Sequence, residues 1–137
     1  MAMAKPLPRG LRNNNPLNIR KGDNWQGLAP VQSDPDFCIF TSMEWGLRAA
    51  FVILLNYLKK RVDTPDKIIK RWAPPSENNT EAYISHVCTV GQLPRHEVIK
   101  KTNAPRLCRL VWAMAQVECG QVVSYGLIEN AYLLAMR

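Results

Sequence analysis

Apolar residues recur at helical spacing along most of the chain from residue 41 onward. In the first such stretch the apolar residues stand three or four apart, which is typical of one buried helix face: Leu47, Phe51, Leu54, Leu55 and Leu58. Thr41 and Glu44 have the spacing of a capping box, so we expect this helix to begin at Thr41.

Five further helices are predicted from the same periodicity and from local start and stop signals. Thr64 followed by Pro65 opens one of them, and prolines 74 and 75 end it. Asn78 with Glu81 is the cap candidate of the next, which Gly91 closes. The expected ranges are 64–72, 78–91, 94–100, 105–119 and 124–135.

A different pattern occupies residues 17–40, where short apolar stretches alternate with turn signals. The run Phe37-Cys38-Ile39-Phe40 is typical of a strand. We therefore expect a small β-hairpin or three-stranded sheet near the N-terminus, packed on a helical lobe. The predicted fold class is α+β, mostly α, in a single domain over 1–137, with residues 1–12 loosely held.

The charge balance narrows the range of partners. The 137 residues carry a formal net charge of +7, which favours an anionic partner such as nucleic acid, a bacterial wall or a membrane surface, although a solvated basic surface is the plainer alternative. No helix-turn-helix or aromatic RNA-binding pattern supports nucleic acid. The sequence makes no prediction about oligomeric state.

The expectations for localisation and cofactors rest on signals that are missing from the sequence. No apolar run is long enough to span a bilayer, and the N-terminus does not read as a secretory signal. We expect synthesis in the cytoplasm and delivery to a wall by a virion, by lysis or by a secretion machine. The four cysteines form no CxxC pair and only two histidines are present, so neither a metal site nor a cofactor is expected, and the thiols should be free.

Three segments carry residues suited to binding or cleaving sugars. In the first, Asn13-Asn14-Asn15 precedes Trp25: amides offer donors and acceptors for sugar hydroxyls, and an indole gives a flat face for a sugar ring. An Asx-turn and a core tryptophan would explain the same residues. We predict that Asn14, Asn15 and Trp25 line a cleft.

The second segment is Trp72-Ala73-Pro74-Pro75-Ser76-Glu77-Asn78, with Tyr83 one helical turn further on. The prolines hold Glu77 in a rigid loop, where it could act as an acid or position a sugar. The alternative is that Glu77 and Asn78 only cap the following helix, whose positive end stabilises a carboxylate and so opposes a role as general acid. Trp72, Asn78 and Tyr83 are the other candidates for binding substrate.

The third segment is the helix that ends in Glu118, two residues before Gly120. A helix C-terminus and apolar neighbours both disfavour the charged carboxylate, which predicts a raised pKa for Glu118 and suits a general acid. An ordinary last-turn glutamate facing water is the alternative.

These segments together resemble the lysozyme-like superfamily. The order of Asn-Asn, Trp-x-Gly, Phe-x-x-Phe-x-Ser and a helix is similar to its glucosaminidase branch. Arg12 to Pro16, Gly46 to Ala49 and Trp72 to Thr80 look still more like small bacteriophage virion lytic proteins. The helix that ends in Glu118 is similar to the one that carries the sole acid of lytic transglycosylases.

The resemblance implies a lysozyme-like fold and a peptidoglycan-cleaving glycosidase or lytic transglycosylase acting on the β-1,4 bond between N-acetylmuramic acid and N-acetylglucosamine. Glu118 would be the acid; otherwise the acid would be Glu77 or Glu44, or there would be none. In the family the acid's helix precedes the Asn-rich segment; here that order is inverted, which implies a circular permutation. The alternative function is a non-catalytic virion or wall-binding protein.

Overall fold

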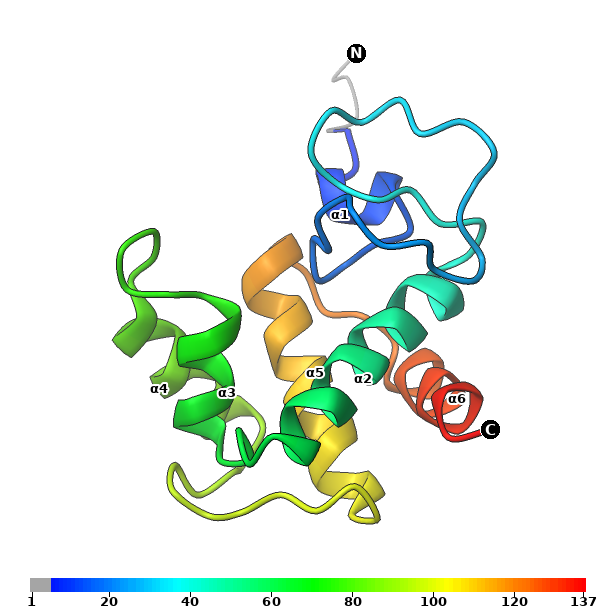
Figure 1. The fold of residues 1–137 in the computed structure, drawn as a ribbon. Coiled ribbons are helices and arrows are strands. Elements are labelled where there is room, and N and C mark those ends of the chain that lie inside the picture. The colour runs from blue at the N-terminus through cyan, green and yellow to red at the C-terminus, as the bar shows by residue number, and fades with distance from the viewer. Residues whose placement is uncertain (1–5) are drawn as a thin grey trace.

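A computed structural model describes residues 6–137 of the chain; the part of the N-terminal expectation that falls on residues 1–5 lies outside them. The described chain is helical (Figure 1). Its helices are α1 (Arg9–Arg12), α2 (Met43–Lys59), α3 (Pro65–Trp72), α4 (Thr80–Val90), α5 (Ala104–Cys119) and α6 (Tyr125–Ala135).

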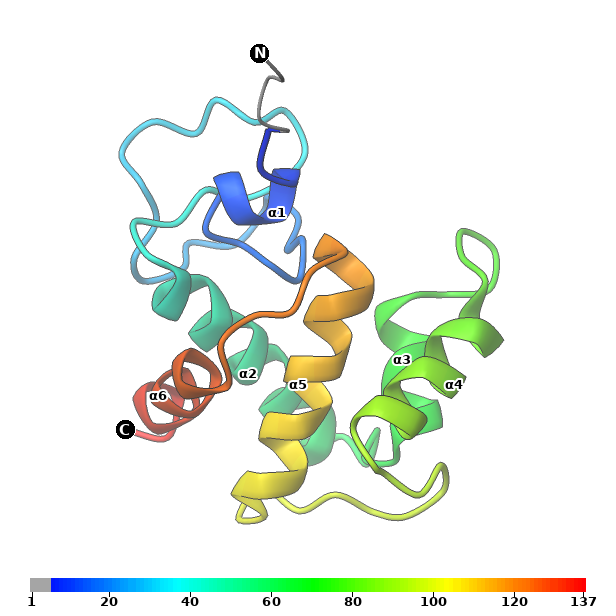
Figure 2. The same ribbon diagram turned by 180° about the vertical axis from the view of Figure 1, so that it is seen from behind.

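Helix α5 runs through the middle of the molecule, with α2 and α6 on one side and α3 and α4 on the other (Figures 1 and 2). It needs apolar residues on several faces because it is covered on several sides, and Leu107, Leu110, Val111 and Met114 are all fully buried. α2 packs against α6, where the rings of Phe51 and Tyr132 meet edge to face at 5.7 Å.

The predicted β-hairpin or sheet is wrong. Between residues 13 and 42 the chain forms only two isolated antiparallel bridges, Arg20 with Phe37 and Leu28 with Phe40, and no strand. Side chains take the place of a neighbouring strand: Gln32 donates to the carbonyl of Ile39 at 2.7 Å and accepts from its N–H at 2.8 Å. In the apolar run at 37–40, Cys38 and Phe40 are buried and Phe37 and Ile39 are partly exposed, and amide side chains hold the run as an irregular segment.

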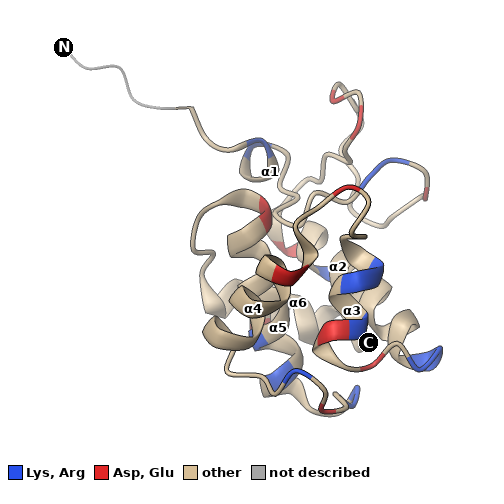
Figure 3. Cartoon of the chain, turned by 90° about the vertical axis from the view of Figure 1, so that its left-hand side faces the viewer, with Lys and Arg blue, Asp and Glu red and all other residues tan. Residues whose placement is uncertain are grey.

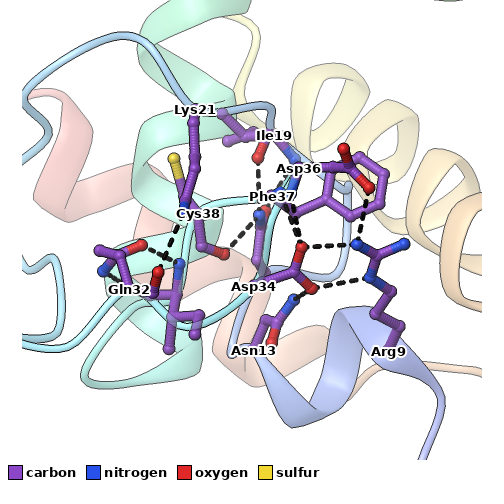
Figure 4. A network of polar contacts seen from close by, with 11 residues as sticks. Arg9, Asn13, Ile19, Lys21, Gln32, Asp34, Asp36, Phe37 and Cys38 are labelled. Carbon is purple, nitrogen blue, oxygen red and sulfur yellow. Dashed lines mark hydrogen bonds and ion pairs between the residues drawn. The ribbon is translucent and has the colours of Figure 1, made fainter.

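Asp34 ties this irregular segment to α1 (Figure 4). Its carboxylate accepts two hydrogen bonds from Arg9, at 2.7 and 2.5 Å, and one from Asn13 at 2.9 Å. The backbone N–H groups of Asp36 and Phe37 donate to the same carboxylate, each at 2.9 Å. The Arg9 guanidinium and the other donors hold the pKa of Asp34 well below its usual range. Residues 9–12 were expected to be loosely held, but they form a helical turn that Arg9 attaches to Asp34.

Two helix starts lie one residue later than predicted. Ser42, not Thr41, caps α2 and accepts from the N–H of Trp45 at 3.3 Å. Asn79, not Asn78, caps α4 and accepts from the N–H of Ala82 at 3.2 Å. In both places adjacent residues are suitable caps, and the choice depends on how the preceding loop arrives.

The predicted helix over 94–100 is wrong, because this segment is drawn out to reach the α2–α3 loop. The N–H of Ile99 donates to the carbonyl of Asp63 at 2.7 Å, and the Ile99 side chain is buried. Helix α5 begins at Ala104, one residue before the predicted Pro105, with Asn103 as its cap. Other predicted boundaries are confirmed: Thr64 precedes α3 with Pro65 as its first residue, and Gly120 ends α5 with a φ of 72°.

All four cysteines are free, and Cys38, Cys108 and Cys119 are buried. Over the described part of the chain, no helix combines the length and the apolar character needed to cross a membrane.

Candidate active-site cleft

Glu118 lies in the last turn of α5, where two distant segments hold it. Tyr83 of α4 donates its hydroxyl to Glu118 Oε2 at 2.9 Å. The side-chain amide of Asn18 donates to the Glu118 backbone carbonyl at 3.1 Å and lies 3.4 Å from Oε1. Because the last carbonyls of a helix have no partner within it, Asn18 satisfies one of them and positions the carboxyl at the same time.

The carboxyl of Glu118 is partly buried, and this burial raises its pKa above the usual value of 4.5. The hydrogen bonds from Tyr83 and Asn18 act in the opposite direction because they favour the carboxylate, and the Trp72 side chain does the same. Burial outweighs these donors. The raised pKa predicted for Glu118 is confirmed, with burial as its main cause.

Tyr83 lies behind this carboxyl and is not an open sugar-binding surface. Its side chain is only 6% exposed, which leaves little area for a ligand. Burial raises the pKa of Tyr83 well above 10, and the neighbouring Glu118 adds to the shift, so its hydroxyl remains a donor at physiological pH. The role that the structure assigns to Tyr83 is to orient Glu118.

An open cleft of about 690 Å³ passes in front of Glu118. The loop of residues 17–23 forms one wall, the loop of residues 72–78 forms the other, and Ile53 and Tyr57 of α2 lie between them. Of the residues predicted from the sequence, Glu118, Glu77, Trp72 and Asn78 all line this cleft. Residues from α5 and from the loop after α3 therefore meet at one site, as the sugar-binding hypothesis requires.

Asn14, Asn15 and Trp25 are not among the residues that line the cleft. Asn15 is fully buried and bonds to the backbone of Ile19 and Cys38. Asn14 donates to the carbonyl of Phe40 at 3.0 Å and has a φ of 51°, a left-handed conformation that asparagine tolerates. Trp25 packs against the core. These residues shape the loop that carries the cleft wall.

Five further residues line the cleft that the sequence pattern did not indicate: Asn18, Arg20, Lys21, Asp23 and Tyr57. Of these residues, Asn18 had the clearest signal in the sequence. It continues the asparagine-rich segment and has a φ of 54°, which asparagine tolerates better than most residues. Nothing in its local sequence indicated a contact with a helix end 100 residues away.

Glu77 differs from Glu118 in its surroundings although it lines the same cleft. Its N–H donates to the carbonyl of Pro74 at 3.0 Å, which closes a tight turn, and the residue is exposed. Asn78 donates to the same carbonyl at 3.2 Å. Glu77 is thus fixed through its backbone but remains in water. Within residues 6–137, no three His, Cys, Asp or Glu side chains are grouped as ligands for a metal ion.

These features define the class of protein: a small helical domain with an open cleft and a partly buried glutamic acid at the end of its central helix. The chain is 38% identical to protein P5 of Pseudoalteromonas phage PM2 over 117 residues. The aligned region covers 82% of this chain and 71% of that protein. It belongs to the family of this phage protein. No family model matches the chain.

Proposed function

We propose that this protein cleaves the glycan strands of peptidoglycan at the β-1,4 bond between N-acetylmuramic acid and N-acetylglucosamine, with Glu118 as general acid. The observation that carries the proposal is the Glu118 carboxyl itself. It is partly buried, it faces an open cleft, and Tyr83 and Asn18 hold it in one orientation. A raised pKa keeps more of this carboxyl protonated as the pH approaches neutrality, which a general acid requires.

The chemistry needs one proton donor at the glycosidic oxygen. Glu118 gives its proton to the leaving oxygen as the bond from that oxygen to the muramic C1 breaks. The muramic 6-hydroxyl then attacks C1, and its proton returns to the Glu118 carboxylate. This route needs a single acid/base residue, which suits a site where one carboxyl is partly buried and the others that line the cleft, Glu77 and Asp23, are exposed.

The walls of the cleft suit a sugar chain. Trp72 and Tyr57 lie edge to face at 6.4 Å and present aromatic surface, while Asn18 and Asn78 bring amides that can bond to hydroxyl and N-acetyl groups. Aromatic faces combined with amides are typical of carbohydrate sites, whereas a nucleic-acid groove would require an excess of cations.

The relative and the resemblance support the same proposal. A phage protein in the family agrees with a virion lytic role and with delivery to the wall by a phage. The proximity of Asn18 to Glu118 also supports the circular-permutation hypothesis, because it brings the asparagine-rich segment to the end of the glutamate helix despite the inverted chain order.

The test is loss of turbidity of purified peptidoglycan by the protein and by its Glu118→Gln and Glu77→Gln variants. Glutamine keeps the shape of the side chain and removes the transferable proton. We expect Glu118→Gln to lower the rate about a hundredfold or more and Glu77→Gln to lower it less. Melting temperatures check that both variants fold.

Two results would contradict the proposal. An active Glu118→Gln variant beside an inactive Glu77→Gln variant would move the chemistry to the loop after α3. A folded parent protein that cleaves no wall type but sediments with insoluble peptidoglycan would instead be a wall-binding protein.

A further inference from the structure

A second hollow lies beside the last turns of α2 and shares no lining residue with the cleft, and the proposed function does not use it. The last turn of α2, the segment 98–101 and the end of α6 enclose a groove of about 570 Å³. Glu118 lies at the C-terminal end of α5, whereas Lys100 and Lys101 lie just before its N-terminal end. Figure 1 shows the N-terminal end of α5 at the bottom of the molecule and its C-terminal end near the middle, below α1. The groove is therefore separate from the candidate active site.

The shape of the groove is held by two tertiary hydrogen bonds. The Ile99 N–H donates to the Asp63 carbonyl at 2.7 Å, and the Tyr132 hydroxyl donates to the Lys101 carbonyl at 2.9 Å. These contacts join the segment 98–101 to the α2–α3 loop and to α6. The side chains on its rim are thus carried by a fixed backbone.

The rim is basic. Lys59, Lys60, Lys100 and Lys101 are all exposed, and none of them forms an ion pair within residues 6–137. Asp63 is the acidic residue in the lining, and Arg61 neutralises it at 3.0 Å. Figure 3 shows basic segments, with acidic ones between them, in the half of the molecule away from α1. Unpaired positive charge on one face attracts an anionic partner.

The lining between these basic side chains is apolar. Val98 is 44% exposed and Met136 is 39% exposed, and the partly exposed side chains of Leu55 and Leu58 lie in the same lining. A nucleic acid would leave this apolar surface without a partner. Flexible lysines without fixed acceptors also suit a diffuse layer of negative charge better than one specific carboxylate, for which arginine is the usual residue.

We propose that this face binds the surface of a membrane that contains anionic phospholipids. The lysines contact the headgroup layer, and Val98 and Met136 enter its apolar boundary. The inference stands independently of any activity in the cleft.

The test is co-sedimentation of the full chain with vesicles of phosphatidylcholine alone and of phosphatidylcholine mixed with phosphatidylglycerol. We expect binding to the mixed vesicles, little binding to the neutral ones, and weaker binding at high salt. Each lysine near such a surface contributes about 1 kcal/mol, so Lys100→Glu with Lys101→Glu should lower the partition coefficient by at least about tenfold. Lys67→Glu with Arg12→Glu, which changes the net charge equally at exposed positions elsewhere, is the matched control.

A second pair of variants separates a lipid surface from another polyanion. Val98→Ser with Met136→Ser should weaken binding to the mixed vesicles and leave binding to duplex DNA or polyglutamate unchanged. Equal loss in the two charge-reversed proteins would overturn the proposal, because net charge alone would then explain binding. Polyglutamate or DNA bound more tightly than the mixed vesicles would also overturn it and indicate an acidic protein or a nucleic acid as the partner.

Discussion

At the scale of single residues, the asparagines show how one residue type serves different purposes in one segment. Asn15 is buried and replaces backbone partners, Asn14 holds the chain at Phe40, and Asn18 reaches the end of α5. All three have the same donors and acceptors. Their roles differ only through what the fold places beside each amide, so a run of asparagines predicts polar contacts but not which residue faces a ligand.

Glu118 leads to a prediction about stability and pH. Because its pKa is raised in the folded protein, the folded state holds the proton more tightly than the unfolded chain does. Stability should therefore fall as the pH rises from about the usual value of 4.5 through the folded pKa. Glu118→Gln removes the cost of ionising a partly buried carboxyl. The melting temperature of the variant minus that of the parent should therefore increase from pH 4 to pH 8.

Tyr83→Phe provides the second variant for this measurement. It removes a donor that favours the carboxylate, so the decline of stability with pH should become steeper. A melting-temperature difference between Glu118→Gln and the parent that is the same at all pH values would show that Glu118 does not titrate differently on folding.

At the scale of elements, helix interiors followed the sequence pattern, and helix ends depended on their loops. The start of α3 at Pro65 and the end of α5 before Gly120 come from backbone preferences of the residues themselves. The starts of α2 and α4 were each displaced by one residue, because two neighbouring side chains could cap equally well. The expected strands did not form, because the backbone around residues 37–40 pairs only at isolated bridges, and the Gln32 side chain bonds the Ile39 N–H in place of a strand neighbour.

The α4 cap gives a prediction that separates stability from function. Asn79→Ala removes the side-chain acceptor for the Ala82 N–H and should lower the free energy of unfolding by about 1 kcal/mol. Asn78→Ala removes an exposed hydrogen bond and should cost less than about 0.5 kcal/mol while altering the cleft. Urea denaturation of both variants measures the difference. A larger loss for Asn78→Ala would make that residue the true cap.

At the scale of the whole molecule, the irregular segment before α2 stays in place through polar contacts and a few buried side chains. Four apolar side chains of the segment belong to the core: Leu17, Ile19, Cys38 and Phe40. The Asp34 carboxylate accepts hydrogen bonds from Arg9 and Asn13 of the same region. This segment carries Asn18 and one wall of the cleft. The integrity of the site therefore depends on the attachment of a region that has no sheet of its own.

The Asp34 contacts predict an acid-sensitive attachment. Since the folded pKa of Asp34 is depressed, its contribution to stability is present above the usual value of 3.8 and is lost as the pH falls below it. Asp34→Asn should lower the melting temperature at pH 7, and its difference from the parent should shrink between pH 5 and pH 2. Asp36→Asn, which removes only an exposed contact with Arg9, should have a smaller effect. An equal effect of both variants would mean that Asp34 has no special role.

The amino-acid sequence by itself determined the helical character of the chain, most helix limits and the place of Glu118 at a helix end, because these depend on residues within a few positions of one another. The segments that resemble lytic proteins contain Glu118, Glu77, Trp72 and Asn78, and these four residues share one cleft. Tertiary structure alone decided the absence of a sheet, the burial of Tyr83 and the meeting of Asn18 with Glu118. The last two outcomes rest on contacts between residues 35 and 100 positions apart, those of Tyr83 and Asn18 with Glu118. Local periodicity carries no information about contacts at that separation, since they form only when the helices pack.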